Sequence, residues 1–134
     1  MENVAIKARL LSLFAIGCGG FLGAILRYLF SEGCQKLSKN LWFPLGTFSV
    51  NIIGCFILGL LGGWSESKQL FSPTFRFIVM IGFLGAFTTF STFSYETLSL
   101  LRDRETLYAF FNVSSNIVVG LFAAWLGLTV SNII

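Results

Sequence analysis

The chain has 134 residues, of which 55% are hydrophobic and only 11% are charged, with a net charge of +3. Soluble domains carry about 25% charged residues, so the sequence predicts an all-α membrane protein. Histidine, the most frequent general base and metal ligand, is absent, and no serine or cysteine has an evident activating partner, so we do not expect an enzyme.

Four apolar segments account for most of the chain. A membrane helix needs about 20 residues to cross a hydrocarbon core about 30 Å thick. We therefore predict a single four-helix transmembrane domain over residues 1–134, with spans near residues 10–30, 45–64, 74–101 and 108–130. Such spans leave no room for a soluble domain.

The first segment resembles a secretory signal near Cys18. The apolar run continues past this residue to Leu26, however, which favours an uncleaved membrane span. Gly19 and Gly23 are four residues apart on one helix face, a spacing typical of close contacts between membrane helices.

The second segment carries two polar side chains on one face. Thr47 and Asn51 are four residues apart, so a helix places both on the same side. Asn51 lies deep enough in the membrane for its amide to need partners. A hydrogen bond between helices is one explanation, and a place on a solute path is the other.

The third segment contains the run GFLGAFTTFSTF from Gly82 to Phe93. This run is too apolar for a soluble loop and too rich in hydroxyl groups for an ordinary membrane helix. Gly82 and Gly85 can loosen a helix, and the hydroxyls can pair with freed carbonyls. Irregular backbone within a membrane persists only where protein buries it or where it lines a wet cavity. We therefore predict a broken third helix beside something polar.

The resumed helix combines aromatic rings with polar groups. Phe90 and Phe93 are three residues apart, which places both rings on one face. Glu96 follows Thr92 by four residues, so Thr88, Thr92 and Glu96 are predicted to form a polar stripe.

The fourth segment carries Asn112, Ser115 and Asn116 on one helix face. Asn112 and Ser115 could pair with the third helix or continue a polar path. Pairing is the simpler interpretation for Ser115.

The basic residues are divided almost evenly between the two sides of the membrane. With four spans, four lysines and arginines fall on one side and five on the other, so the positive-inside rule favours neither orientation. We predict that the chain inserts both ways and forms an antiparallel, dual-topology homodimer. The two sets are Lys7, Arg9, Lys68 and Arg76, and Arg27, Lys36, Lys39, Arg102 and Arg104.

These motifs resemble the CrcB/Fluc family of bacterial fluoride ion channels. The resemblance covers nearly the whole chain and rests on Gly20 to Ala24 with Arg27-Tyr28, on Gly46-Thr47 with Val50-Asn51, and on Gly82 to Phe93. It implies a dual-topology homodimer that crosses the bacterial inner membrane several times and exports fluoride passively, which limits fluoride toxicity in the cytoplasm. The implied partners are fluoride, a second copy and the lipid bilayer, with no nucleic acid.

The resemblance also implies roles for individual residues. Phe90 and Phe93 would be the pore phenylalanines, with Asn51 turned toward them. A structural Na⁺ at the dimer interface would be held by the backbone carbonyls of Gly85 and Thr88. Polar residues from all three later spans would complete the path, although asparagines stand in the fourth span where tyrosine or serine hydroxyls are expected. The predicted fluoride pathway comprises Asn51, Phe90, Phe93, Thr47, Thr92, Asn112, Asn116 and Glu96.

The chemistry of these residues agrees with this implication. Aromatic ring edges carry partial positive charge, so Phe90 and Phe93 can stabilise a small anion without a fixed charge that would hold it too tightly. Asn51 adds an N–H donor. Weak donors permit both entry and exit, which conduction requires.

Two other classes of protein are compatible with a short four-span chain. A dual-topology, proton-coupled multidrug transporter needs an ionisable residue deep in the membrane. The first span has none between Leu10 and Leu26, which leaves only Glu96, late in the third. A non-transporting assembly protein would use the glycines but would leave Asn51 and the hydroxyl cluster unexplained.

Overall fold

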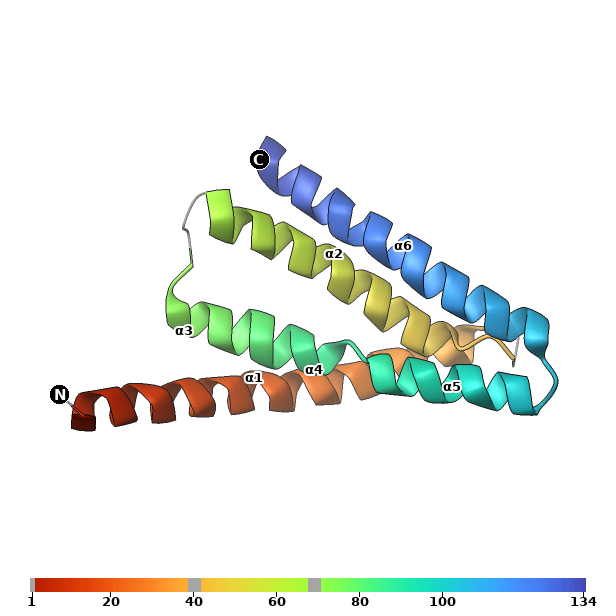
Figure 1. Cartoon of the computed structure of the whole chain (residues 1–134), viewed down its shortest axis with the longest axis horizontal. Helices are drawn as coiled ribbons and strands as arrows, with labels where there is room; N and C mark the ends of the chain where they lie inside the picture. The colour runs from red at the N-terminus through yellow and green to blue at the C-terminus, as the bar shows by residue number, and fades with distance from the viewer. Residues whose placement is uncertain (1, 39–41, 68–70) are drawn as a thin grey trace.

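The structure, a computed structural model, describes residues 2–38, 42–67 and 71–134. Within these ranges all regular structure is helical. Figure 1 shows a long first helix beside a third crossing made of several pieces, with two further helices running side by side. The elements are α1 (Glu2–Leu37), α2 (Leu45–Ser67), α3 (Pro73–Phe75), the π-helical segment η1 (Arg76–Leu84), α4 (Gly85–Phe87), α5 (Phe90–Arg102) and α6 (Thr106–Ile133).

Among the described residues, four stretches are long and apolar enough to cross a membrane, as the sequence predicts. The first helix continues beyond residue 30, where Glu32 Oε1 and Lys36 Nζ pair at 2.7 Å one turn apart. Two basic residues used in the charge count, Lys39 and Lys68, lie outside the described residues. The four stretches are Ile6–Leu37, Leu45–Ser67, Pro73–Arg102 and Thr106–Ile133.

The helices pack as two close pairs: α1 lies along η1 and α4, and α2 lies along α6 (Figure 1). Glycines permit the close approach. A methyl group at Gly23 would overlap the Phe83 carbonyl, and one at Gly59 would overlap the Ala124 carbonyl. Gly19 lies against η1 in the same way, which confirms the predicted contact face of the first helix.

The third crossing is broken, as predicted, and the break falls at Thr88 and Thr89. Thr88 has φ −84° and ψ 158°, and Thr89 has φ −151° and ψ 117°. Both conformations are extended, and helix resumes at Phe90. Threonine branches at Cβ and favours extended backbone, which explains why the helix yields at this pair.

The glycines before the break have a different structural role from the one predicted. Gly82 and Gly85 both remain within helical segments. A side chain at Gly82 would overlap the Ile16 carbonyl of α1, so this glycine allows helix packing rather than loosening the backbone. The sequence therefore located the break correctly to within a few residues but not its immediate cause.

Gln35 holds the end of α1 against the beginning of α2. Its Nε2 donates to the Phe43 carbonyl at 3.2 Å, and its Oε1 accepts from the Gly46 N–H at 3.1 Å. The first N–H groups of a helix lack partners within the helix, so this amide satisfies one of them. The contact fixes the register at which Thr47 and Asn51 enter the bundle.

Candidate functional site

Asn51 reaches the break from α2 and bonds the backbone of Thr89 twice. The Thr89 N–H donates to Asn51 Oδ1 at 2.9 Å, and Asn51 Nδ2 donates to the Thr89 carbonyl at 3.2 Å. Unpaired backbone groups are costly away from water, and a break creates them. One side chain therefore satisfies both backbone groups of Thr89, and the partners that Asn51 was predicted to need lie on the broken crossing.

This contact also takes the donor that a continuous helix would give to the Gly85 carbonyl. In a continuous helix the Thr89 N–H would pair with the carbonyl four residues earlier, that of Gly85. Here Asn51 takes that donor. The Thr88 carbonyl lies 3.4 Å from Arg27 Nη1, a long hydrogen bond. Carbonyl oxygens such as those of Gly85 and Thr88 are the ligand type that binds hard monovalent cations in channels.

One hydroxyl group at the break, that of Thr89, caps the beginning of α5. Thr89 Oγ1 accepts from the Thr92 N–H at 3.2 Å, which caps the first turn of α5. The same hydroxyl donates to Thr92 Oγ1 at 2.9 Å and lies 3.4 Å from Ser91 Oγ. Ser91 and Thr92 themselves remain exposed on the surface of this chain.

The rings of Phe90 and Phe93 are neighbours at the start of α5. Their centroids are 5.6 Å apart with 52° between the ring planes, in agreement with the predicted shared face. Phe93 is only 8% exposed, whereas Phe90 is 79% exposed. The Phe93 ring is therefore fixed by packing, whereas the edge and face of the Phe90 ring are accessible at the surface of this chain.

The asparagines of α6 join the same region. Asn116 Oδ1 accepts from Asn51 Nδ2 at 3.1 Å, so the two N–H bonds of Asn51 are directed to Asn116 and to the Thr89 carbonyl. Asn112 is fully buried and donates to Thr97 Oγ1 at 2.9 Å. The hydrogen bonds of Asn51 thus run to the broken backbone and to α6, beside the ring pair.

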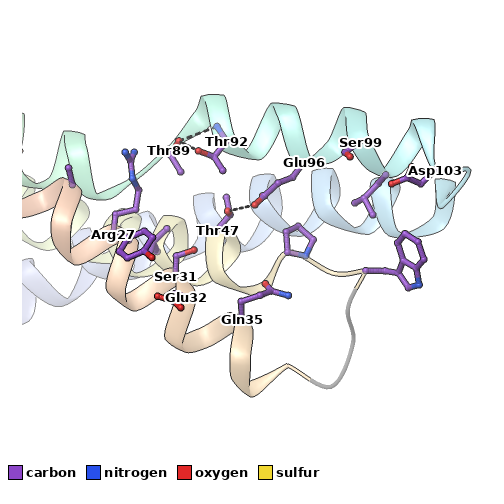
Figure 2. Close-up of a pocket in the computed structure, with 16 residues that line it drawn as sticks. Arg27, Ser31, Glu32, Gln35, Thr47, Thr89, Thr92, Glu96, Ser99 and Asp103 are labelled. Carbon is purple, nitrogen blue, oxygen red and sulfur yellow. Dashed lines mark hydrogen bonds between the residues drawn. The ribbon is translucent and has the colours of Figure 1, made fainter.

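An open cavity of about 680 Å³ lies between α1, α2 and α5. Figure 2 shows Thr47 and Glu96 pointing toward each other in it, and Thr47 Oγ1 donates to Glu96 Oε1 at 2.8 Å. Glu96 Oε2 is buried and has no hydrogen-bond partner among the described residues. Glu96 therefore brings an acceptor with spare capacity into the cavity.

The predicted pathway residues occupy two neighbouring places in the structure. One group lines the cavity and the other surrounds the break, and Thr89 belongs to both because it lines the cavity and bonds Asn51. The cavity set is Thr47, Thr92 and Glu96. The break set is Asn51, Phe90, Phe93, Asn112 and Asn116, which lie at the break or are linked to it through the hydrogen bonds of Asn51.

Sequence reasoning did not place Arg27 in this region. The structure brings its guanidinium to the break and into the lining of the cavity (Figure 2). A signal was available in the sequence: Arg27 lies one helical turn after Gly23, on the face where the glycine spacing predicts a close helix contact. The glycine contact thus carries α1 past the break with Arg27 at the level of Thr88.

A family model and individual relatives place this chain in the same protein family. A family model described as CrcB-like protein, Camphor Resistance (CrcB), matches residues 14–128. A Methanosarcina barkeri protein named fluoride-specific ion channel FluC 3 is 44% identical over 120 residues, covering 90% of this chain and 89% of the relative.

Two bacterial relatives named fluoride-specific ion channel FluC are equally similar. The Campylobacter jejuni protein is 46% identical over 123 residues, or 89% of this chain and 96% of the relative. The Geotalea daltonii protein is 46% identical over 119 residues, or 89% of this chain and 95% of the relative. The chain thus spans nearly the full length of relatives that share the name fluoride-specific ion channel.

Proposed function

Since this chain belongs to the CrcB family, we propose that it is a fluoride channel that lets fluoride leave the cell passively across the inner membrane and so limits fluoride toxicity. The names of its relatives support this function. The structural observation that carries it is the break in the third crossing. There the Asn51 side chain hydrogen-bonds the backbone N–H and carbonyl of Thr89, beside the Phe90 and Phe93 rings.

The ring pair can bind fluoride weakly enough to release it. Ring edges are partially positive and carry no net charge, so they can replace part of the hydration shell of an anion without trapping it. Phe93 is held by packing and Phe90 is open, so an anion can reach the edge of one ring while the other stays in place.

The cavity set extends the path from the break toward the surface. Thr89 Oγ1 and Thr92 Oγ1 are already linked at 2.9 Å, and Thr47 follows from α2 (Figure 2). A threonine hydroxyl has one O–H and rotates. The Thr47 hydroxyl can therefore turn from Glu96 to a passing anion and exchange one acceptor for another.

The channel acts as an antiparallel homodimer in this proposal. In a single chain Ser91 and Thr92 are exposed beside the break, and Phe90 is exposed with them. Polar groups and irregular backbone need cover at membrane depth. A second copy inserted the opposite way covers the same surface by two-fold symmetry, and the even charge distribution permits that insertion.

A Na⁺ ion at the two-fold axis completes the proposed assembly. The carbonyls of Gly85 and Thr88 suit it, because Asn51 diverts the N–H that would otherwise cover Gly85. When bound, the ion would balance the carbonyl dipoles of both copies and hold them together. Arg27, at 3.4 Å from the Thr88 carbonyl, orients that carbonyl from the side of α1.

Fluoride efflux from proteoliposomes tests the function directly. Liposomes loaded with potassium fluoride and carrying the purified protein should release fluoride to a fluoride-selective electrode once valinomycin carries the compensating K⁺, without a proton gradient. Proton-coupled uptake of a cationic drug would instead identify a multidrug transporter. Liposomes that neither release fluoride nor take up drug would indicate an assembly protein.

A further inference from the structure

A chain of side-chain hydrogen bonds leaves the break, crosses two helices and returns to the third crossing. It starts at the Thr89 N–H, passes through α2 and α6, and ends at the Phe93 carbonyl; we call it the amide chain. The donor–acceptor distances are 2.9 Å from Thr89 N to Asn51 Oδ1, 3.1 Å from Asn51 Nδ2 to Asn116 Oδ1, 3.0 Å from Asn116 Nδ2 to Asn112 Oδ1, 2.9 Å from Asn112 Nδ2 to Thr97 Oγ1, and 2.8 Å from Thr97 Oγ1 to the Phe93 carbonyl.

The two ends of the amide chain fix its direction. A backbone N–H can only donate, so Asn51 must present its oxygen to Thr89. Its nitrogen then faces Asn116, which must present an oxygen in turn, and Asn112 repeats the pattern. At the far end a backbone carbonyl can only accept, which agrees with donation from the threonine hydroxyl. Each amide therefore has a single orientation that satisfies its neighbours.

Burial gives this arrangement its rigidity. Asn112 has no exposed surface, and Asn51 and Asn116 are only partly exposed. Asn116 Nδ2 also lies 2.9 Å from the Asn112 carbonyl, which ties it to its own helix. In a low-dielectric interior, linked hydrogen bonds polarise one another and an unpaired member is costly. Loss of one amide thus affects the orientation of the next.

We propose, building on the channel function above, that Asn116 and Asn112 are positioning residues for the anion path. They hold the Asn51 amide in the orientation that accepts from the Thr89 N–H, and in this way they keep the third crossing open at the break. Neither needs to touch the anion. The two asparagines of the fourth span thus determine the backbone conformation of the third span at Thr89.

The consequence for the break follows from the donors and acceptors involved. If Asn51 turned its amide over, its nitrogen would face the Thr89 N–H, donor against donor. The Thr89 N–H would then be free to return to the Gly85 carbonyl and rebuild a regular helical turn. Thr89, which lines the cavity and caps α5, would move with it.

Asn116→Leu removes the acceptor for Asn51 while nearly conserving side-chain size. Fluoride efflux should fall about tenfold or more, because a buried donor loses its partner. Asn116→Ser serves as a second variant that folds more readily, since its hydroxyl can bond its own helix but is too short to reach Asn51. Thr129→Val is the matched control: it is on α6, and among the described residues its hydroxyl bonds only the Trp125 carbonyl of its own helix. Its efflux should equal that of the wild type.

A second measurement follows the Thr89 backbone directly. In protein labelled with ¹⁵N-threonine, the Thr89 amide signal should move in Asn116→Leu and in Asn51→Ala. The double variant should add little to the shift of Asn51→Ala alone, since Asn116 acts through Asn51. Thr129→Val should leave the Thr89 signal in place, so a general effect of altering α6 is distinguished from a specific one.

The outcomes separate the inference from the function on which it rests. Reduced efflux with a displaced Thr89 signal supports the positioning role. A Thr89 signal that stays in place in both Asn116 variants overturns that role, even though wild-type efflux still supports the channel. Absence of efflux from the wild-type protein overturns the channel and the role within it together.

Discussion

At the scale of single residues, Asn51 replaces the hydrogen bonds that a helix loses where it breaks. Its amide pairs with both backbone groups of Thr89 and with Asn116. Depth in the membrane and the need for partners were evident from the sequence. Which partners it has was not, because they lie 38 and 65 positions away along the chain.

The two phenylalanines that we propose line the pore, Phe90 and Phe93, allow a test at the same scale. Phe93→Ile should lower fluoride efflux by about tenfold or more while the dimer still assembles, because isoleucine fills space but has no positive ring edge. Efflux is followed with the fluoride electrode, and assembly by size-exclusion chromatography.

Phe122→Ile provides the matched control for this substitution. Phe122 lies on α6, is 57% exposed and has a ring contact only with Trp125 among the described residues. Its replacement should leave efflux unchanged. Equal efflux from well-assembled Phe93→Ile and Phe122→Ile proteins would count against a pore role for the ring of Phe93.

At the scale of elements, two glycine-mediated helix pairs carry the site. The contact of α1 with η1 and α4 sets Arg27 beside Thr88, and the contact of α2 with α6 sets Asn51 beside Asn116. The break itself depends on α2, because Asn51 satisfies the backbone that α4 and α5 leave open. A third crossing outside this bundle would lack those partners.

Gly23→Ala tests the packing of the first pair. The new methyl group would overlap the Phe83 carbonyl of η1, and we expect a loss of about 1–3 kcal/mol in the free energy of unfolding. The unfolding midpoint in detergent measures it.

Gly33→Ala is the control on the same helix, since among the described residues nothing beyond the neighbouring backbone of α1 lies within 4 Å of a methyl group there. Alanine has the higher helix propensity, so this variant should unfold at the wild-type midpoint or be more stable by up to about 1 kcal/mol. If the two variants lose stability equally, close packing at Gly23 is not what holds α1 to η1.

At the scale of the whole molecule, one copy leaves its most unusual surface uncovered. The exposed ring of Phe90, the hydroxyls of Ser91 and Thr92 and the edge of the break all lie together at the start of α5. Lipid can cover a ring but cannot pair hydroxyls or carbonyls. We propose that an inverted second copy covers this surface, because the charge balance permits that insertion.

A single substitution can shift the predicted dual orientation. An accessibility tag at the N-terminus should be reached from both sides of the membrane in comparable amounts. Glu105→Lys adds a basic residue to the side that carries Lys36, Lys39, Arg102 and Arg104, so this variant should favour the orientation with the α5–α6 turn inside. Glu105→Gln is the control and should change little, because acidic residues contribute weakly to the rule. A single orientation in the wild type would contradict the prediction.

Removal of Na⁺ tests the proposed cation at the dimer axis. Replacing Na⁺ by N-methyl-D-glucamine on both sides of the membrane should weaken the dimer and slow efflux, because the carbonyls of Gly85 and Thr88 would face one another without a cation between them. Dimer content after dilution in detergent, with and without Na⁺, gives the comparison. Identical dimer stability in the two conditions would argue against a structural ion.

The sequence by itself determined the number of crossings and the presence of a break in the third. Both are local properties: apolar length sets a membrane span, and a run such as Thr88 to Phe93 cannot form an ordinary span. The sequence also predicted the shared face of Phe90 and Phe93, because helical periodicity needs no information from other segments.

Only the tertiary structure decided which groups meet. It divided the predicted pathway into a cavity set and a break set, brought Arg27 to Thr88, and linked Asn51 through Asn116 and Asn112 in one direction. These contacts depend on the register between helices, which is set by where glycines let two backbones approach. Because that register joins residues far apart in the chain, no local pattern contains it.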